Sequence, residues 1–138
     1  MYFQNHPNIT QVKEVWEWNN VCFLVLEYCS GGELFHYFLG RKHLTESEVS
    51  AIMKQLLSAL AYLHSQNIIH GEIKPENFML ATKEGPQHGV KIIDFGLTKE
   101  VRRPDPMKVM RTGVSNSHFL TFVLMLAVLY CTRSDSSE

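Results

Sequence analysis

The sequence has few cysteines, no excess of charge of either sign and no secretion signal at its start. Its 138 residues carry 13 Lys and Arg against 14 Asp and Glu, a formal net charge of −1. This balance excludes a broad electrostatic attraction to nucleic acid or to an anionic membrane. The three cysteines, Cys22, Cys29 and Cys131, form an odd set without metal-ligand spacing. Because the N-terminus also lacks the charged-then-apolar order of a signal peptide, we expect a reducing, cytoplasmic compartment.

The composition is that of an ordinary globular protein. Hydrophobic residues make up 45% and charged residues 20% of the sequence, which argues against disorder or a disulfide scaffold. The length leaves room for one domain. The apolar run FLTFVLMLAVLYC at residues 119–131 would span about 20 Å as a helix, short of the roughly 30 Å bilayer core. We expect this tail to pack against a core or a partner, with a short membrane anchor as the alternative.

Hydrophobic patterning in the first third of the chain predicts a hairpin and a short helix. Residues 11–18 and 21–28 are rich in Val, Trp, Phe and Leu. Asn19 and Asn20 between them tolerate the positive φ angles of a tight turn. A short helix over residues 33–39 should follow and end at a glycine, Gly40.

A long capped helix comes next. Thr45 and Glu48 have the spacing of a capping box. Apolar residues then recur at steps of three and four, which predicts one buried stripe along a helix of about five turns. The stripe consists of Val49, Ile52, Met53, Leu56, Leu57, Leu60 and Leu63.

The second half of the chain changes to short apolar pieces joined by polar loops. Ile68 and Ile69 lead into the polar stretch HGEIKPEN, and a Gly- and Pro-bearing turn at 85–89 joins the pieces at 78–80 and 90–93 into a small hairpin. Apolar pieces that feed polar loops indicate a site rather than a core. From residue 97 to 117 the apolar residues follow neither the helical nor the strand period, and two prolines are present. We therefore expect a loop there.

Two polar clusters follow short apolar strands: Glu72, Lys74 and Asn77 in the first, and Asp94 in the second. Carboxylates, an ammonium and an amide are the groups needed to hold a metal-bound polyphosphate and to take a proton from a hydroxyl. Asn77 and Asp94 offer oxygen ligands suited to Mg²⁺, and Lys74 offers a compact positive charge. Taken singly, Asp94 could equally be a turn former at a strand end and Lys74 a solvated charge.

These clusters resemble motifs of the protein kinases. HGEIKPEN resembles the catalytic loop of that family, usually HRDLKPEN, and DFG at 94–96 matches its metal-binding motif. HPNI at 6–9 resembles the turn before the fourth strand of the kinase N-lobe, and VLEYCSGGELF resembles the hinge and the start of the next helix. GGELF and KPENFML are similar to serine/threonine kinases of the calcium-dependent and calmodulin-dependent type. The resemblance implies an α+β, partial protein-kinase-like fold over 1–114 and a non-matching apolar tail over 115–138.

The resemblance also implies a site for ATP. It assigns the edge of the adenine to the backbone of Glu27 and Cys29, with Leu26 as the gatekeeper behind the base and Met79 as the floor beneath it. Glu33 would face the ribose or a basic residue of a protein substrate. From the residues alone, Glu33 is equally an acid at a helix N-terminus and Cys29 a small apolar residue.

The catalytic loop would surround the phosphates. Glu72 stands at the position of the base, Lys74 would reach the γ-phosphate, Asn77 and Asp94 would hold Mg²⁺, and Glu76 belongs to the implied cofactor-binding residues. The internal apolar column of the family would contain Val12, His70 and Phe95.

The sequence departs from the family within this loop. Glu72 replaces Asp, which moves the carboxylate about 1.5 Å further from the backbone. Since a misplacement of about 1 Å can cost roughly a hundredfold in rate, we expect impaired proton transfer. Gly71 replaces the Arg that pairs with an activation-loop phosphate, so a phosphate on Thr112 would lack that partner.

The sequence also contains no Gly-rich phosphate loop, third-strand Lys, partner Glu or APE motif. Two hypotheses follow. The first is a serine/threonine kinase domain fragment that is inactive or impaired as this chain, whose lineage chemistry transfers the γ-phosphoryl group of Mg·ATP to a protein hydroxyl. The second is a non-catalytic pseudokinase or truncated interaction module with a regulatory protein partner.

Overall fold

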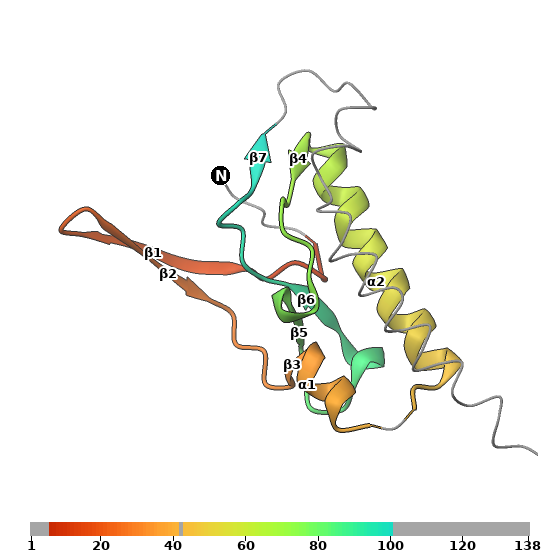
Figure 1. The fold of residues 1–138 in the computed structure, drawn as a ribbon. Coiled ribbons are helices and arrows are strands. Elements are labelled where there is room, and N and C mark those ends of the chain that lie inside the picture. The colour runs from red at the N-terminus through yellow and green to blue at the C-terminus, as the bar shows by residue number, and fades with distance from the viewer. Residues whose placement is uncertain (1–5, 42, 101–138) are drawn as a thin grey trace, which may run out of the picture.

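The computed structural model describes residues 6–41 and 43–100, which form a small α+β unit. A long helix, α2 (Glu46–Ser65), lies along one side of a small sheet (Figure 1). A hairpin of β1 (Val12–Trp18) and β2 (Val21–Leu26) projects away from the other side (Figure 1).

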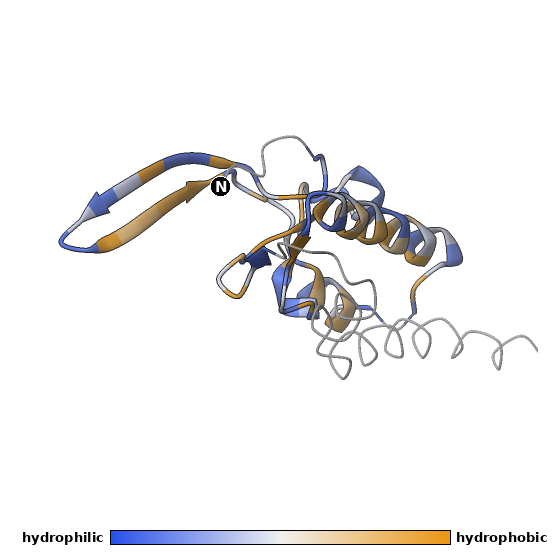
Figure 2. Cartoon of the chain, turned by 90° about the horizontal axis from the view of Figure 1, so that it is seen from above, coloured by the Kyte–Doolittle hydropathy of each residue, from blue (hydrophilic) through white to orange (hydrophobic). Residues whose placement is uncertain are grey.

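The β1–β2 hairpin confirms the prediction made from the asparagine pair. Asn19 and Asn20 have φ angles of 48° and 61°, the left-handed values of a tight turn, and the two strands pair antiparallel. All side chains from residue 13 to 26 are exposed, including Trp16 at 61% and Trp18 at 70%. β2 is an almost unbroken apolar strand (Figure 2). The hairpin therefore holds apolar side chains on both faces, away from the core.

The central sheet contains β3 (Gly32–Glu33), β5 (Phe78–Leu80) and β6 (Val90–Ile92) in the order β3-β5-β6. The β5–β6 pair is the small hairpin that the sequence predicts, whereas β3 is too short for its pattern to be read. Met79 lies opposite both Glu33 and Lys91 across the sheet. Since opposed residues of antiparallel strands share a face, this row lies on one side, and the buried side chains of β5 and β6 lie on the other: Phe78, Leu80, Val90 and Ile92.

Helix α2 begins at the predicted capping box, and every residue of the predicted stripe but one is buried or half-buried. The Glu48 amide donates to Thr45 Oγ1 at 3.2 Å, and the Thr45 amide donates to Glu48 Oε2 at 2.9 Å. Leu57 was wrongly included in the stripe, because it is 51% exposed. It follows Leu56 by one residue, or about 100° around the helix, whereas Ala59, three residues after Leu56, is fully buried.

Glu48 also connects α2 to α1 (Leu34–Leu39), which ends at Gly40 as predicted. Its carboxylate accepts hydrogen bonds from Tyr37 Oη and, at 2.9 Å, from Arg41 Nη1. The Arg41 guanidinium lies over the Tyr37 ring at 4.3 Å. Burial and the bond to Glu48 raise the pKa of Tyr37 to about 12. A buried charge therefore fixes the junction of the two helices.

The remaining elements join the two polar loops. β4 (Ile68–Ile69) pairs antiparallel with β7 (Lys99–Glu100), so the expectation of a loop from residue 97 was wrong at β7, whose order comes from its partner strand rather than from its own pattern. The rest of that expected loop and the apolar tail at 119–131 lie outside the described residues. Within the described part of the chain, no helix is long and apolar enough to cross a membrane.

Candidate functional site

One cavity of about 340 Å³ lies where the end of β2 meets β5 and the residues that follow β6. Its volume is in the range of small-molecule sites. Five of the residues predicted to bind a cofactor line it together: Leu26, Glu27, Cys29, Met79 and Asp94. Three lining residues were not singled out by sequence reasoning: Thr10, Tyr28 and Ile93. The fold therefore gathers these predicted residues, distant in sequence, around a single space.

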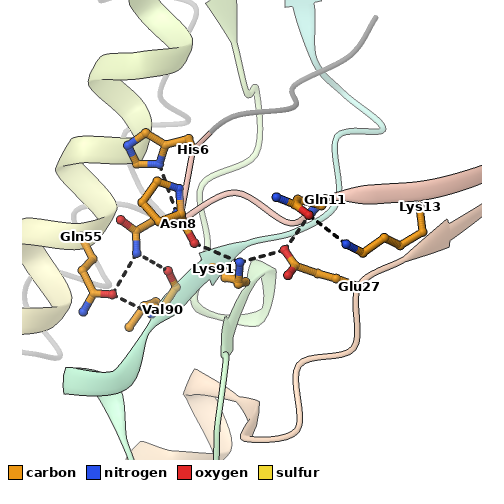
Figure 3. Close-up of polar contacts among 9 residues, drawn as sticks. His6, Asn8, Gln11, Lys13, Glu27, Gln55, Val90 and Lys91 are labelled. Atoms are coloured by element: carbon orange, nitrogen blue, oxygen red, sulfur yellow. Dashed lines mark hydrogen bonds and ion pairs between the residues drawn. The ribbon is translucent and has the colours of Figure 1, made fainter.

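Residues 26–29 form one wall of the cavity. Glu27 joins this wall by hydrogen bonds to Gln11 and Lys91 (Figure 3). The Glu27 amide donates to the Gln11 carbonyl at 2.9 Å, and the Gln11 amide donates to Glu27 Oε1 at 2.8 Å. Lys91 Nζ donates to the same Oε1 at 2.8 Å and to the Pro7 carbonyl at 3.0 Å. Burial acts to raise the pKa of Glu27, but the hydrogen bonds from Lys91 and Gln11 outweigh it, and the pKa lies below its ordinary value.

A second network of hydrogen bonds joins the turn at residues 6–9, the N-terminal turn, to α2 and β6 (Figure 3). Gln55 Oε1 accepts from Asn8 Nδ2 and from the Val90 amide, both at 2.8 Å. Asn8 Nδ2 also donates to the Val90 carbonyl at 2.8 Å, and Gln55 Nε2 donates to the Pro86 carbonyl at 2.7 Å. Because both ends of the Gln55 amide are used, the helix holds this turn in one position.

Asp94 lies two residues after the end of β6 in a left-handed conformation, with φ of 61°. Its Oδ1 accepts from the Gly96 amide at 3.1 Å, an arrangement that Asp tolerates better than most residues. Asp94 therefore does form a turn, as the simpler interpretation of the sequence predicts. The same residue also borders the cavity, which a turn former alone does not require.

Asn77 ends the 3₁₀ turn Pro75–Asn77 and is buried. Its Nδ2 donates to the Glu72 carbonyl at 2.9 Å, which closes the loop on itself. Its backbone carbonyl accepts from the Ile93 amide at 2.9 Å. This bond extends the β5–β6 pairing and places Asn77 beside the residue that precedes Asp94.

Glu72 and Lys74 form an ion pair in which Lys74 Nζ donates to Glu72 Oε1 at 2.8 Å. This bond is the main cause that lowers the pKa of Glu72 and raises the pKa of Lys74. Both side chains are about one third exposed, at 31% and 29%. The predicted base and the predicted phosphate contact therefore neutralise one another in this structure.

His70 is buried and packs on Phe95 with ring centroids 5.0 Å apart. Its Nε2 lies 3.2 Å from the Ile93 carbonyl, and the Glu72 amide donates to Nδ1 at 3.4 Å. These partners assign the proton to Nε2 of a neutral ring. Burial is the main cause that lowers the pKa of His70. The packing of His70 on Phe95 agrees with the predicted column, while Val12 lies at the start of β1 opposite Leu26.

Gly71 allows the loop to approach the segment after Asp94 closely. Its φ is 88°, and a Cβ there would lie 2.5 Å from the Leu97 carbonyl oxygen. The β4–β7 pair and a bond of 3.5 Å from Thr98 Oγ1 to the His70 carbonyl join the same two segments. A side chain at position 71 is therefore incompatible with this packing.

Comparison with known proteins gives a family for this geometry. The protein kinase domain matches residues 1–121. The chain belongs to the protein kinase family. It is 41% identical over 104 residues to calcium-dependent protein kinase 4 of Plasmodium berghei (strain Anka), 40% over 104 residues to calcium-dependent protein kinase 4 of Plasmodium falciparum (isolate 3D7), and 43% over 96 residues to death-associated protein kinase 2 of Mus musculus.

These alignments cover 75%, 75% and 70% of this chain but 20%, 20% and 26% of the relatives. The chain thus spans about a fifth to a quarter of the kinases it matches. The predicted resemblance to calcium-dependent serine/threonine kinases and the predicted α+β, partial kinase-like fold are confirmed. The boundary predicted at residue 114 lies outside the described residues and stays a prediction.

The residues of this kinase segment fit the ATP and Mg²⁺ that the family generally uses. Leu26, Met79 and Ile93 give the cavity apolar walls for a planar base, and the carboxylate of Asp94 borders it. In the described part of the chain, no three His, Cys, Asp or Glu side chains gather as a metal cluster. Magnesium would instead rely on Asp94, the amide oxygen of Asn77 and phosphate oxygens, a ligand set that Mg²⁺ favours.

Besides Glu72, Lys74 and Asn77, two further predicted site residues lie outside the cavity lining. Glu33 sits in β3 at the start of α1 and pairs with His36 Nδ1 at 3.0 Å, so the alternative of a helix N-terminal acid describes its position. Glu76 is exposed in the turn before β5. Sequence reasoning also missed Lys91, which has no motif of its own and gains its contacts only from the fold.

Proposed function

We propose that this chain supplies the base-binding wall and the catalytic loop of a serine/threonine protein kinase, and that as this chain it binds Mg·ATP without measurable phosphoryl transfer. The observation that carries the proposal is the cavity that Leu26, Glu27, Cys29, Met79 and Asp94 border together. A cavity of this size with apolar walls and one carboxylate at its border suits a purine base whose phosphates leave toward a metal.

Each residue has a defined part in the proposed chemistry. The backbone of Glu27 and Cys29 would meet the edge of the adenine. Mg²⁺ held by Asn77 and Asp94 would offset the negative charge of the phosphates. In the family reaction a hydroxyl oxygen of the protein substrate bonds to the γ-phosphorus, ADP leaves, and the hydroxyl proton passes to the carboxylate at position 72.

The Glu72–Lys74 ion pair is the reason for the proposed impairment. Lys74 must leave Glu72 before its ammonium can contact a γ-phosphate, and both groups already satisfy one another at 2.8 Å. The lowered pKa of Glu72 makes its carboxylate a weaker proton acceptor. The longer side chain of Glu compared with Asp adds the misplacement expected from the sequence.

Isothermal titration of the chain with ATP, with and without Mg²⁺, tests the proposal. We expect a magnesium-dependent dissociation constant near the micromolar range, weakened by Asp94→Asn and unchanged by Glu46→Gln, an exposed acid on α2. No binding in either condition would refute it. A radioactive phosphoryl-transfer assay that shows turnover abolished by Asp94→Ala would refute the proposed inactivity, but it would support the proposed ATP site.

The second candidate is a non-catalytic interaction module. It is favoured by the hairpin, whose apolar side chains are exposed on both faces, with Phe23 at 51% and Leu24 at 56%, because exposed apolar patches of this kind mark contacts with other proteins. Absence of nucleotide binding together with a stable complex with a protein partner would favour this candidate over the first.

The proposed partners and location follow from the same expectations. A protein substrate or regulatory protein agrees with the kinase family, and the near-zero net charge still disfavours nucleic acid. Cys22 and Cys29 are free thiols in the structure. A cytoplasmic location stays a prediction from cysteine usage, to be checked by fractionation of cells that express the chain.

A further inference from the structure

Lys91 is the one charged residue of β6. Its ammonium contacts Glu27 and Pro7, which are distant in sequence, rather than extending into solvent. Lys91 lies opposite Met79, the proposed floor of the cavity, and therefore on the same face of the sheet. Its side chain is 14% exposed, and that of its ion-pair partner Glu27 is 21% exposed. An ion pair so shielded from water is held more firmly than a surface pair.

The contacts of Lys91 converge on the backbone that borders the cavity. Its Nζ donates to Glu27 Oε1 and to the Pro7 carbonyl, while the Gln11 amide donates to the same Oε1 (Figure 3). The Glu27 amide is held in turn by the Gln11 carbonyl. One ammonium thus connects the sheet, the N-terminal turn and the wall at residues 26–29.

We propose that Lys91 is a positioning residue of the nucleotide site: through Glu27 it fixes the backbone edge that selects adenine. The inference rests on the proposed function. Adenine presents an amino group where guanine presents a carbonyl oxygen, so a carbonyl held in place at Glu27 accepts from the first base and repels the second. If this edge is free to move, the distinction between the two bases weakens.

The test compares the affinities of the full chain for Mg·ATP and Mg·GTP by titration. In Lys91→Met, the ratio of the GTP to the ATP dissociation constant should fall by about tenfold, within the usual range of coupling between neighbouring residues. Lys91→Arg should retain most of the ratio, and Lys83→Met, a change at an exposed lysine, should retain all of it. In the Glu27→Gln background, Lys91→Met should have little further effect, because the route through Glu27 is already broken.

The ratio separates positioning from mere stabilisation. A variant that only unfolds part of the sample loses affinity for both nucleotides equally, so an unchanged ratio in Lys91→Met would overturn the inference and leave the proposed function standing. If the unaltered chain binds neither nucleotide, the proposed function fails, and amide hydrogen exchange decides the positioning role. Faster exchange at Glu27 in Lys91→Met, with α2 unchanged and Lys83→Met as the control, supports it; equal exchange overturns it.

Discussion

Replacing Gly71 by alanine tests whether the catalytic loop and the segment after Asp94 are packed as closely as the structure indicates. At position 71 the backbone has a φ of 88°, and an added Cβ would lie 2.5 Å from the Leu97 carbonyl oxygen. Gly32 provides a matched control, because its φ is 76° and nothing lies within 4 Å of a Cβ built there. The two substitutions share the backbone strain and differ in the steric contact.

The expected magnitudes follow from these two terms. A left-handed φ costs an alanine roughly 1–2 kcal/mol, which both variants bear. Forcing a backbone carbonyl aside at position 71 adds about 2 kcal/mol, in the range measured for overpacked sites. At about 4 °C per kcal/mol for a domain of this size, Gly71→Ala should melt about 8 °C below Gly32→Ala. Gly71→Arg, which restores the residue usual in the family, should lose at least as much.

Thermal melts followed by far-ultraviolet circular dichroism measure the difference. A Gly71→Ala chain that fails to fold while Gly32→Ala folds is the extreme form of the expected result. Melting temperatures within about 2 °C of one another would refute the close approach of Gly71 to Leu97. In that case the packing would not require a glycine at position 71, and the substitution would only remove the arginine that is usual in the family.

Three further predictions concern buried polar groups. Thr10 Oγ1 is buried without a hydrogen-bond partner among the described residues, so Thr10→Val should raise the free energy of unfolding by about 1 kcal/mol, and an equal or lower melting temperature would contradict this. Glu48→Ala removes the carboxylate shared by two helices and should cost about 3 kcal/mol in a urea titration, against less than about 1 kcal/mol for the exposed Glu46→Ala. Because burial lowers the pKa of His70 below the ordinary value for histidine, the unfolded chain takes up a proton that the folded chain resists; stability should therefore fall as the pH drops below about 6.5. His70→Gln should flatten this slope between pH 7.5 and 5.5, whereas His64→Gln, an exposed change, should not.

Local sequence signals predicted the elements that local interactions form. The Asn19–Asn20 turn and the Thr45–Glu48 capping box were predicted because each depends on neighbours in the chain. The stripe on α2 was predicted except at Leu57. One residue corresponds to about 100° around the helix, so a residue at the border of the apolar face can be buried or exposed. The sequence alone does not show where the buried face ends.

Features that depend on distant partners were not predicted. β7 was expected to be loop because its two residues become a strand only by pairing with β4. Lys91 carries no signal of its role, since Glu27 and Pro7 reach it only through the fold. Five of the cavity residues were predicted from motif resemblance rather than from pattern, and Thr10, Tyr28 and Ile93, for which the resemblance assigned no role, were missed.

The placement of the aromatic side chains has a practical consequence for spectroscopy. The sequence has two tryptophans, and both Trp16 and Trp18 stand on the projecting hairpin in contact with solvent. Their emission should already resemble that of indole in water and should change little when the core melts. A shift to shorter wavelength would instead signal that another surface has covered the hairpin, which makes the native fluorophores a label-free probe of association.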